Sequence, residues 1–318
     1  MFKIKELPED FYVKELIDFK LKDKGEYKIY SLNKKNYNTL DAIEIISNRF
    51  KLNEVGYCGN KDKNAVTEQF ISIKGNVNLE NLNIKDISLK FQGYLDKRLS
   101  LGDNSGNYFK IVVRNLEKKY KKVGFIVNYF DEQRFSEHNS QVGKMLLQKK
   151  FKEICQILEI DSKNPIDSLN RINKKLLKLY LHSYQSYLFN KVVSIYLSKS
   201  KKVKKVKYSL GEFVFVDKFE KLKFPLLSFD TEFGKKDKIY LEILKEEGIK
   251  LDDFIIRSFP ALLDETTHRD VFVKVKDFKT LSYDKDELNP GMFKQEISFI
   301  LPKGSYATIL VKEMFEKK

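Results

Sequence analysis

The hydrophobic pattern changes its period twice along the chain, and this change constrains the fold more than any other feature of the sequence. In residues 1–137, apolar and polar residues alternate in segments typical of strands, at 26–32, 70–73 and 108–114. An amphipathic segment at about 40–50 predicts a helix with Thr39 as its N-cap.

From about residue 138 the apolar residues recur at helical spacing. Strand-like segments return at 210–216, 271–275 and 295–301, and a last helix is expected through Phe315. With 318 residues, the chain is long enough for two domains or for one domain that carries a large insertion.

Composition excludes several classes of protein. Hydrophobic residues make up 42% of the chain, which is enough for a packed core and argues against disorder. No apolar run reaches the ~18 residues that a membrane span needs, and the charged N-terminus is unlike a signal peptide. Cys58 and Cys155 form no CxxC or pairing pattern. We therefore expect a cytoplasmic protein.

The formal net charge of +15 has two explanations. All but seven of the 60 basic residues are lysine, and a lysine-rich composition can follow from an A/T-rich genome without any partner. The alternative is a polyanionic partner whose phosphates the lysines neutralise. The basic run 199–207 contains no arginine, and we expect it to be a solvated loop rather than an RNA contact.

Two segments carry chemistry. In the loop 56–69, Asp62 stands between Lys61 and Lys63, whose charges favour an ionised carboxylate that can act as a nucleophile or a base. The segment 128–135 combines aromatic rings, amides and a rare arginine, which are residues that stack on bases, read base edges and hold phosphate. Taken alone, the Lys61–Asp62–Lys63 stretch is better explained as a polar turn with a local ion pair, and the segment 128–135 is equally well explained as the buried end of a strand.

Six blocks in order resemble the TruD family of tRNA pseudouridine synthases. Loop 56–69 is similar to the family's G-x-x-G-x-K-D-+-x-A-x-T-x-Q signature, and 128–135 to its N-[YF]-F-[GD]-x-Q-R-F block. The remaining blocks are Asp10–Glu15, Leu101–Phe109, Ser183–Asn190 and Leu301–Thr308. The resemblance covers nearly the whole chain. Ser136 departs from it, since the family usually has glycine there.

The resemblance implies an α+β fold in which a catalytic domain with a mostly antiparallel mixed sheet is interrupted by an inserted α/β domain. The boundaries we predict are 1–137 plus 268–318 for the catalytic domain and 138–267 for the insertion. The implied activity is isomerisation of a uridine in tRNA, most often at tRNA position 13, to pseudouridine. We expect no cofactor and no metal, tRNA as the partner, and a monomer.

The resemblance also assigns roles to residues. It makes Asp62 the catalytic aspartate and Phe130 the ring that stacks on the target base, with Asn128 beside it. The remaining candidates are basic or amide side chains placed near the active site or against RNA: Lys14, Lys61, Lys63, Gln133 and Arg134. The sequence does not choose between attack of Asp62 on C1′ and abstraction of the C2′ proton.

Two rival functions remain open at this point. A non-catalytic RNA-binding protein on the same fold accounts for the basic charge and the aromatic residues equally well. A metal-dependent nuclease needs clustered carboxylates, and the pairs Asp131–Glu132 and Asp252–Asp253 are not tied to Asp62 by any spacing. The histidines 138, 182 and 268 lack the spacing of metal ligands, and no HExxH, GxSxG or phosphate-binding glycine loop occurs.

Overall fold

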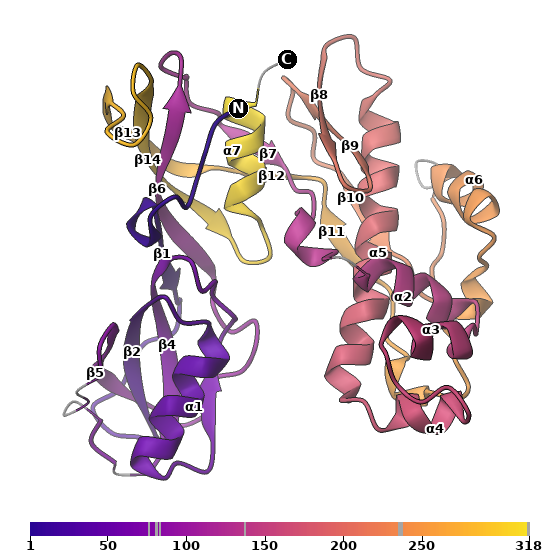
Figure 1. Ribbon diagram of the computed structural model, residues 1–318, viewed down its shortest axis with the longest axis horizontal. Coiled ribbons are helices and arrows are strands. Elements are labelled where there is room, and N and C mark those ends of the chain that lie inside the picture. Colours follow the sequence, from indigo (N-terminus) through magenta and orange to yellow (C-terminus); the bar gives the residue numbers. More distant parts are fainter. Residues whose placement is uncertain (76, 80–81, 83, 137, 235–237, 317–318) are drawn as a thin grey trace. The chain divides into compact units, whose positions relative to one another are not determined.

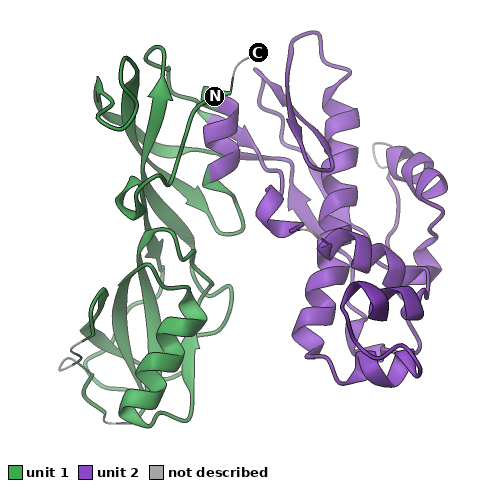
Figure 2. Ribbon diagram, viewed as in Figure 1, with its two compact units in different colours: residues 1–124, 274–307, 314–317 green, residues 125–273, 308–313, 318 purple. Residues whose placement is uncertain are grey.

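The computed structural model describes residues 1–318 except 76, 80–81, 83, 137, 235–237 and 317–318 (Figure 1). The chain divides into two compact units, which Figure 2 shows in different colours. Unit 1 comprises residues 1–124, 274–307 and 314–317, and unit 2 comprises residues 125–273, 308–313 and 318. The two units are described separately.

Unit 1 is built on an eight-stranded sheet. Its strands are β1 (Phe11–Leu16), β2 (Tyr27–Lys35), β3 (Val55–Tyr57), β4 (Val66–Lys74), β5 (Ile87–Leu95), β6 (Gly106–Leu116), β13 (Lys276–Lys285) and β14 (Phe293–Pro302). Their order is β13-β14-β6-β1-β4-β2-β5, with β3 beside β4. Among these strands β1 and β4 run parallel and the other pairs are antiparallel.

Helix α1 (Thr39–Phe50) packs on this sheet. Its inward residues Ala42 and Ile46 are fully buried, and they lie in one core cluster with Tyr30, Leu32 and Ile71 of the sheet. The period of 3.6 seen in the sequence therefore marks the face that covers β2 and β4.

The N-cap of α1 differs from the prediction. Asn38 caps the helix, because its side chain accepts a hydrogen bond of 2.9 Å from the backbone N–H of Asp41. The hydroxyl of Thr39, the predicted cap, is engaged elsewhere, with Lys61 and Gln69.

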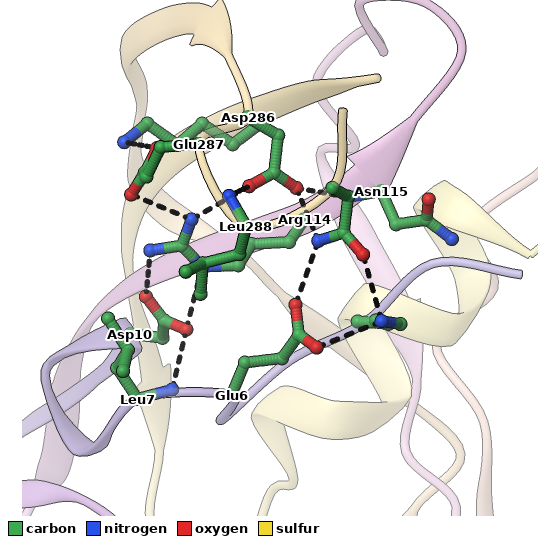
Figure 3. Close-up of polar contacts among 11 residues, drawn as sticks. Glu6, Leu7, Asp10, Arg114, Asn115, Asp286, Glu287 and Leu288 are labelled. Carbon is green, nitrogen blue, oxygen red and sulfur yellow. Dashed lines mark hydrogen bonds and ion pairs between the residues drawn. The ribbon is translucent and has the colours of Figure 1, made fainter. Parts of the chain in front are cut away.

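A buried arginine holds the N-terminal segment against the sheet (Figure 3). The guanidinium of Arg114, on β6, donates two hydrogen bonds of 2.9 Å to the carboxylate of Asp10 and one of 2.9 Å to Asp286. It also contacts Glu287 at 3.0 Å. Backbone hydrogen bonds in both directions join Lys3 to Arg114, so residues 3–10 are fixed along β6.

Unit 2 is organised around the long helix α5 (Lys174–Leu197). Its other helices are α2 (Asn139–Leu147), α3 (Phe151–Ile157), α4 (Pro165–Asn170) and α6 (Lys238–Glu247). Its paired strands are β7 (Phe125–Val127) with β12 (Phe272–Lys274), β8 (Val203–Tyr208) with β9 (Gly211–Val216), and β10 (Lys223–Leu226) with β11 (Thr267–Asp270). Gly143 lets α2 approach α5 closely, since a Cβ there would lie 2.1 Å from the carbonyl oxygen of Tyr180. Residues 308–313 of the last helix, α7 (Ala307–Phe315), belong to this unit.

The predicted α+β class with a mostly antiparallel sheet is confirmed, and each strand expected from the sequence is present. The prediction for the run 199–207 is wrong in part, because residues 203–207 lie in β8 and pair with β9. The alternation explains this, since Val206 is buried while the lysines on either side face outward or lie partly covered. The domain boundaries stay a prediction. Among the described residues, no helix is both long enough and apolar enough to cross a membrane.

Candidate active site

The loop that carries Asp62 connects two directly paired strands, β3 and β4. Gly56 on β3 has no room for a side chain, because a Cβ would lie 2.3 Å from Ser72 Oγ and 2.5 Å from the carbonyl oxygen of Leu99. At the first residue of the loop, the carbonyl oxygen of Cys58 accepts a hydrogen bond of 2.8 Å from the backbone N–H of Gly102. Lys303 in turn donates to the carbonyl of Gly102 at 2.6 Å. Three blocks that are far apart in the sequence thus meet at the base of the loop.

A chain of side-chain hydrogen bonds fixes the loop backbone. Lys61 donates its backbone N–H to Thr39 Oγ1 at 2.8 Å, and this hydroxyl donates to Gln69 Oε1 at 2.9 Å. Gln69 completes the ring by donating from Nε2 to the carbonyl of Gly59 at 3.2 Å. The threonine and the glutamine are both buried, so the loop has buried polar partners on two elements, α1 and β4.

A buried lysine forms the floor of the loop. The ammonium of Lys34, which is 2% exposed as a residue, donates to three carbonyl oxygens: Tyr37 at 2.6 Å, Asp62 at 3.0 Å and Lys61 at 3.4 Å. Burial lowers the pKa of Lys34 to about 8, although the nearby charge of Asp62 opposes that shift. Lys34 therefore holds the loop backbone in place at Lys61 and Asp62, through hydrogen bonds to their carbonyl oxygens.

Lys61 is engaged inside the protein. Its ammonium pairs with Glu15 Oε1 at 2.7 Å, and the two side chains are 8% and 0% exposed. The second oxygen of Glu15 accepts the backbone N–H of Phe70 at 3.0 Å. This buried pair connects the loop to β1 and β4.

The carboxylate of Asp62 is bound by Lys5. Lys5 Nζ lies 2.5 Å from Asp62 Oδ2, and the two side chains are 22% and 29% exposed. An ammonium at this distance stabilises the charged form of the carboxylate. The ammonium also lies 4.3 Å from the ring centroid of Phe11, which restricts its position.

Lys14, the basic residue that the sequence favoured near the active site, has a different partner. It pairs with Glu68 at 2.9 Å, and Glu68 also accepts a hydrogen bond of 3.0 Å from the hydroxyl of Tyr12. Burial and this hydrogen bond raise the pKa of Tyr12 to about 12. Lys63 lies in the loop itself and is exposed.

Cys58, the first residue of the loop after β3, is a thiol at neutral pH. Burial raises the pKa of Cys58 to about 12, and the charge of Glu15 acts in the same direction. The loop therefore offers a carboxylate as its reactive group.

The second segment lies in unit 2 and is organised by Arg269, which the sequence motifs do not single out. Its guanidinium donates from Nε to the carbonyl of Asn128 at 2.9 Å and from Nη2 to Asn128 Oδ1 at 2.8 Å. The amide nitrogen of Asn128 donates to the carbonyl of Asp270 at 3.0 Å. Both ends of the amide are therefore fixed.

Phe130 lies directly beside this clamp. The guanidinium carbon of Arg269 is 4.0 Å from the ring centroid of Phe130, and that of Arg134 is 5.9 Å from it. Asn190 on α5 holds the backbone of Phe130 through hydrogen bonds of 3.0 and 2.8 Å, and Phe189 packs edge-on with the rings 5.7 Å apart. Phe130 is 8% exposed.

The other residues of the segment 128–135 have mixed roles. Gln133 is exposed, while Arg134 contacts Ser186 at 3.4 Å and accepts a hydrogen bond from Ser183 on its carbonyl at 3.1 Å. Asp131 is buried and binds Lys312 at 2.8 Å. Ser136 has a φ of 36°, so it adopts the left-handed conformation that favours glycine.

Among the described residues, no group of three or more His, Cys, Asp or Glu side chains is arranged to hold a metal ion. The fold and the sites together define a class of protein: an α+β chain with an aspartate–lysine pair on a loop between paired strands, and a cluster of an aromatic ring, an amide and an arginine.

Comparisons with known proteins identify the family within this class. The family model for tRNA pseudouridine synthase D (TruD) matches residues 2–165, 153–221 and 216–314. The tRNA pseudouridine synthase D of Aquifex aeolicus is 31% identical over 98% of this chain and 98% of its own length. A relative from Pyrococcus furiosus, named "Probable tRNA pseudouridine synthase D", is 31% identical over 99% of this chain and 95% of its own length. The crystal structure of a Methanosarcina mazei protein described as "Putative tRNA pseudouridine synthase D (TruD)" superposes with a TM-score of 0.72 at 25% identity, over 99% of this chain and 93% of the other. The chain belongs to the TruD family.

Proposed function

We propose that this protein isomerises a uridine of tRNA to pseudouridine, with Asp62 as the catalytic carboxylate. The observation that carries the proposal is the Asp62–Lys5 pair, at 2.5 Å, on a loop whose backbone is held by Lys34, Thr39 and Gln69. A carboxylate paired with an ammonium, on a loop held at several points, fits a group that must act on one atom of a bound sugar.

The reaction breaks the bond between C1′ and N1 of the uridine and forms a bond between C1′ and C5 of the same base. The proton on C5 leaves, and N1 gains a proton. Asp62 either adds to C1′ or removes the proton from C2′, and Lys5 stabilises the carboxylate before it reacts in both cases. Because electrons and atoms balance within one nucleotide, we expect no redox cofactor and no metal to be needed.

The cluster of Asn128, Phe130 and Arg269 in unit 2 supplies the aromatic ring that the proposed reaction uses. A uridine must leave its stack to react, and a stacked ring offsets about 1–3 kcal/mol of the cost. We assign this role to Phe130, with Asn128 held by Arg269 so that its amide has a fixed orientation. Gln133 and Arg134 are proposed RNA contacts on the same segment.

The basic residues divide by what they contact. Lys63 is exposed and is the RNA contact that we propose on the loop, together with Lys14, which is 44% exposed. Lys61 was also predicted to bind RNA, and its pairing with Glu15 favours a role in holding the loop instead. We further propose tRNA position 13 as the target, a cytoplasmic location, a monomeric enzyme, and the domain division 1–137 plus 268–318 against 138–267.

Replacing the carboxylate tests the catalytic assignment. We expect Asp62→Asn to keep tRNA affinity within about threefold and to abolish tritium release from 5-tritiated uridine in tRNA. The matched control is Asp96→Asn, an exposed aspartate of the same unit that pairs with Lys22. The control should retain wild-type turnover. Substantial turnover by Asp62→Asn would refute the assignment, and full binding without turnover by the wild type would favour a non-catalytic RNA-binding protein.

A further inference from the structure

Unit 2 contains a cavity that neither of the sites above uses. It has a volume of about 720 Å³, within the ~300–1,000 Å³ of typical ligand pockets. It lies where α5 ends at Leu197 and where β9 ends at Val216. Two loops, 198–202 and 217–220, supply most of its lining.

Four lysines from these two loops line the cavity: Lys199, Lys201, Lys202 and Lys218. All four are exposed, and none of them forms an ion pair with a carboxylate among the residues that the structure describes. We call this site the lysine cavity.

Neighbouring lysines of the same run behave differently. Lys205 pairs with Glu212 at 3.2 Å, and Lys204 donates to the carbonyl oxygens of Lys312 and Glu313 at 3.3 and 2.6 Å. Within the run, Lys204 and Lys205 on β8 thus have partners inside the protein, whereas Lys199, Lys201 and Lys202 line the cavity. A favourable interaction with the C-terminus of α5 accounts for Lys199 at most, since the others lie beyond the last turn or on a different loop.

The cavity also has an aromatic wall. Phe219 is 38% exposed, and its ring packs against Phe272 and Phe125 at centroid distances of 5.8 and 5.7 Å. The support behind the ring holds it in place while part of it stays accessible. Two carboxylates, Asp217 and Glu220, also line the cavity, and the hydroxyl of Tyr196 donates to Glu220 at 3.2 Å.

We propose that the lysine cavity is a subsite for one single-stranded nucleotide of the RNA substrate. Its phosphate lies against the ammonium groups, which outnumber the lining carboxylates by two to one, and its base stacks on Phe219. Cations beside a supported aromatic ring are the combination that binds unpaired nucleotides without reading their sequence. The subsite holds RNA away from the reacting base, so it governs affinity and not the chemical step. This inference rests on the proposed function in that it takes RNA as the substrate.

Charge and stacking can be separated by mutation. Lys201→Gln with Lys202→Gln removes two cations, and Phe219→Leu removes the aromatic face but keeps an apolar side chain. The matched control is Lys150→Gln with Lys152→Gln, two exposed lysines elsewhere in unit 2. The measurements are tRNA affinity between 50 and 300 mM salt, turnover at saturating tRNA, and the melting temperature.

We expect the cavity double variant to lower the slope of log affinity against log salt by about 0.7 for each phosphate that the two lysines neutralise in the wild type. Phe219→Leu should lower affinity about fivefold at every salt concentration and leave the slope unchanged. Turnover at saturating tRNA should stay at the wild-type rate in both, and the control should match the wild type throughout.

A slope for the cavity double variant equal to that of the control would overturn the proposal. Unchanged RNA affinity together with a loss of polyglutamate binding would assign the cavity to an acidic protein instead. If the wild type binds tRNA but forms no pseudouridine, the proposed function is wrong. The slopes of log affinity against log salt then still test whether the cavity binds RNA.

Discussion

Arg114 offers the sharpest test of how this fold supports its loop. It is 3% exposed and contacts two buried carboxylates, Asp10 and Asp286, which are 2% and 4% exposed. The substitution Arg114→Met keeps much of the volume and removes every one of these contacts. Both carboxylates then remain buried without their cation.

The size of the destabilisation depends on which hydrogen bonds the two carboxylates retain after Arg114 is replaced. Removing one partner of a buried ion pair costs about 3–5 kcal/mol. Asp286 retains hydrogen bonds from the backbone of Asn115 and Leu288, whereas Asp10 retains one from the backbone of Leu7, so we expect a value in this range and not a doubled one. At about 2–4 °C per kcal/mol for a unit of this size, the melting temperature should fall by roughly 6–20 °C.

The loss of stability in Arg114→Met should also change with pH in a direction that can be measured. Burial by itself raises the pKa of Asp286, but hydrogen bonds from Asn115, Asn289, Leu288 and Arg114 outweigh it and hold the pKa below its usual value. A depressed pKa contributes stability that is present above about pH 4 and is lost as the pH falls further. The deficit of Arg114→Met should therefore be largest near pH 7 and should shrink toward pH 3.5.

The assay is a thermal melt at pH 7 and pH 3.5, beside the control Arg98→Met. Arg98 is 40% exposed and pairs with the exposed Glu54, so its loss should cost at most about 1 kcal/mol. A second variant, Arg114→Met with Asp10→Asn, should recover part of the loss because it removes one unpaired charge. Equal melting temperatures for Arg114→Met and Arg98→Met would refute the argument.

Four further outcomes are expected. Lys5→Met should lower turnover about 100-fold, with tRNA affinity within threefold in a filter-binding assay, because the catalytic carboxylate loses the ammonium that lies 2.5 Å from it. Lys34→Met should lower the free energy of unfolding by about 1–3 kcal/mol in a urea titration, because three carbonyl oxygens lose their donor. Arg269→Lys should lower turnover about tenfold or more with little change in melting temperature, because lysine keeps the charge but not the planar fork. Glu313→Gln should flatten the pH dependence of melting. Burial raises the pKa of Glu313 to about 8, so the stability contributed by its protonated form is fully present below about pH 4.5 and is lost as the pH rises toward 8. The wild type, but not the variant, should therefore lose about 3 kcal/mol of its free energy of unfolding between pH 5 and pH 8.

The sequence predicted four strands of the sheet, β2, β4, β6 and β14, and did not predict β1, β3, β5 or β13. β6 and β14 alternate over most of their length, whereas β2 and β4 each contain a run of consecutive buried residues because both of their faces are covered. β13 escaped prediction because it lies at the edge of the sheet and its residues are mostly polar and exposed. An edge strand has only one neighbour and little core to face, so its sequence carries little signal.

The sequence predicted which loop carries Asp62, but it did not predict which side chains Asp62 contacts. The signature placed Asp62, but its partner Lys5 lies 57 residues earlier and outside the recognised blocks. What brings Lys5 there is the anchoring of residues 3–10 along β6 by Arg114, a long-range effect that no local pattern contains. Lys14 has a favourable position in the sequence, yet the alternation of β1 directs it to Glu68.

Arginine was the more informative basic residue, and its two clearest positions show why. Arg114 holds a carboxylate through two parallel hydrogen bonds, and Arg269 holds a backbone carbonyl and an amide oxygen while its guanidinium carbon lies 4.0 Å from the ring centroid of Phe130. Both tasks need a planar fork that an ammonium cannot supply. In a chain with seven arginines among 60 basic residues, these arginines mark geometry, whereas lysine serves wherever a point charge is enough, as on Asp62, Glu15 and the carbonyl oxygens of the loop. The net charge therefore overstates the surface available to RNA, since Lys5, Lys34 and Lys61 are each engaged within the protein. Affinity for RNA should follow lysines such as Lys63, which is exposed, and Lys14, whose side chain is 44% exposed.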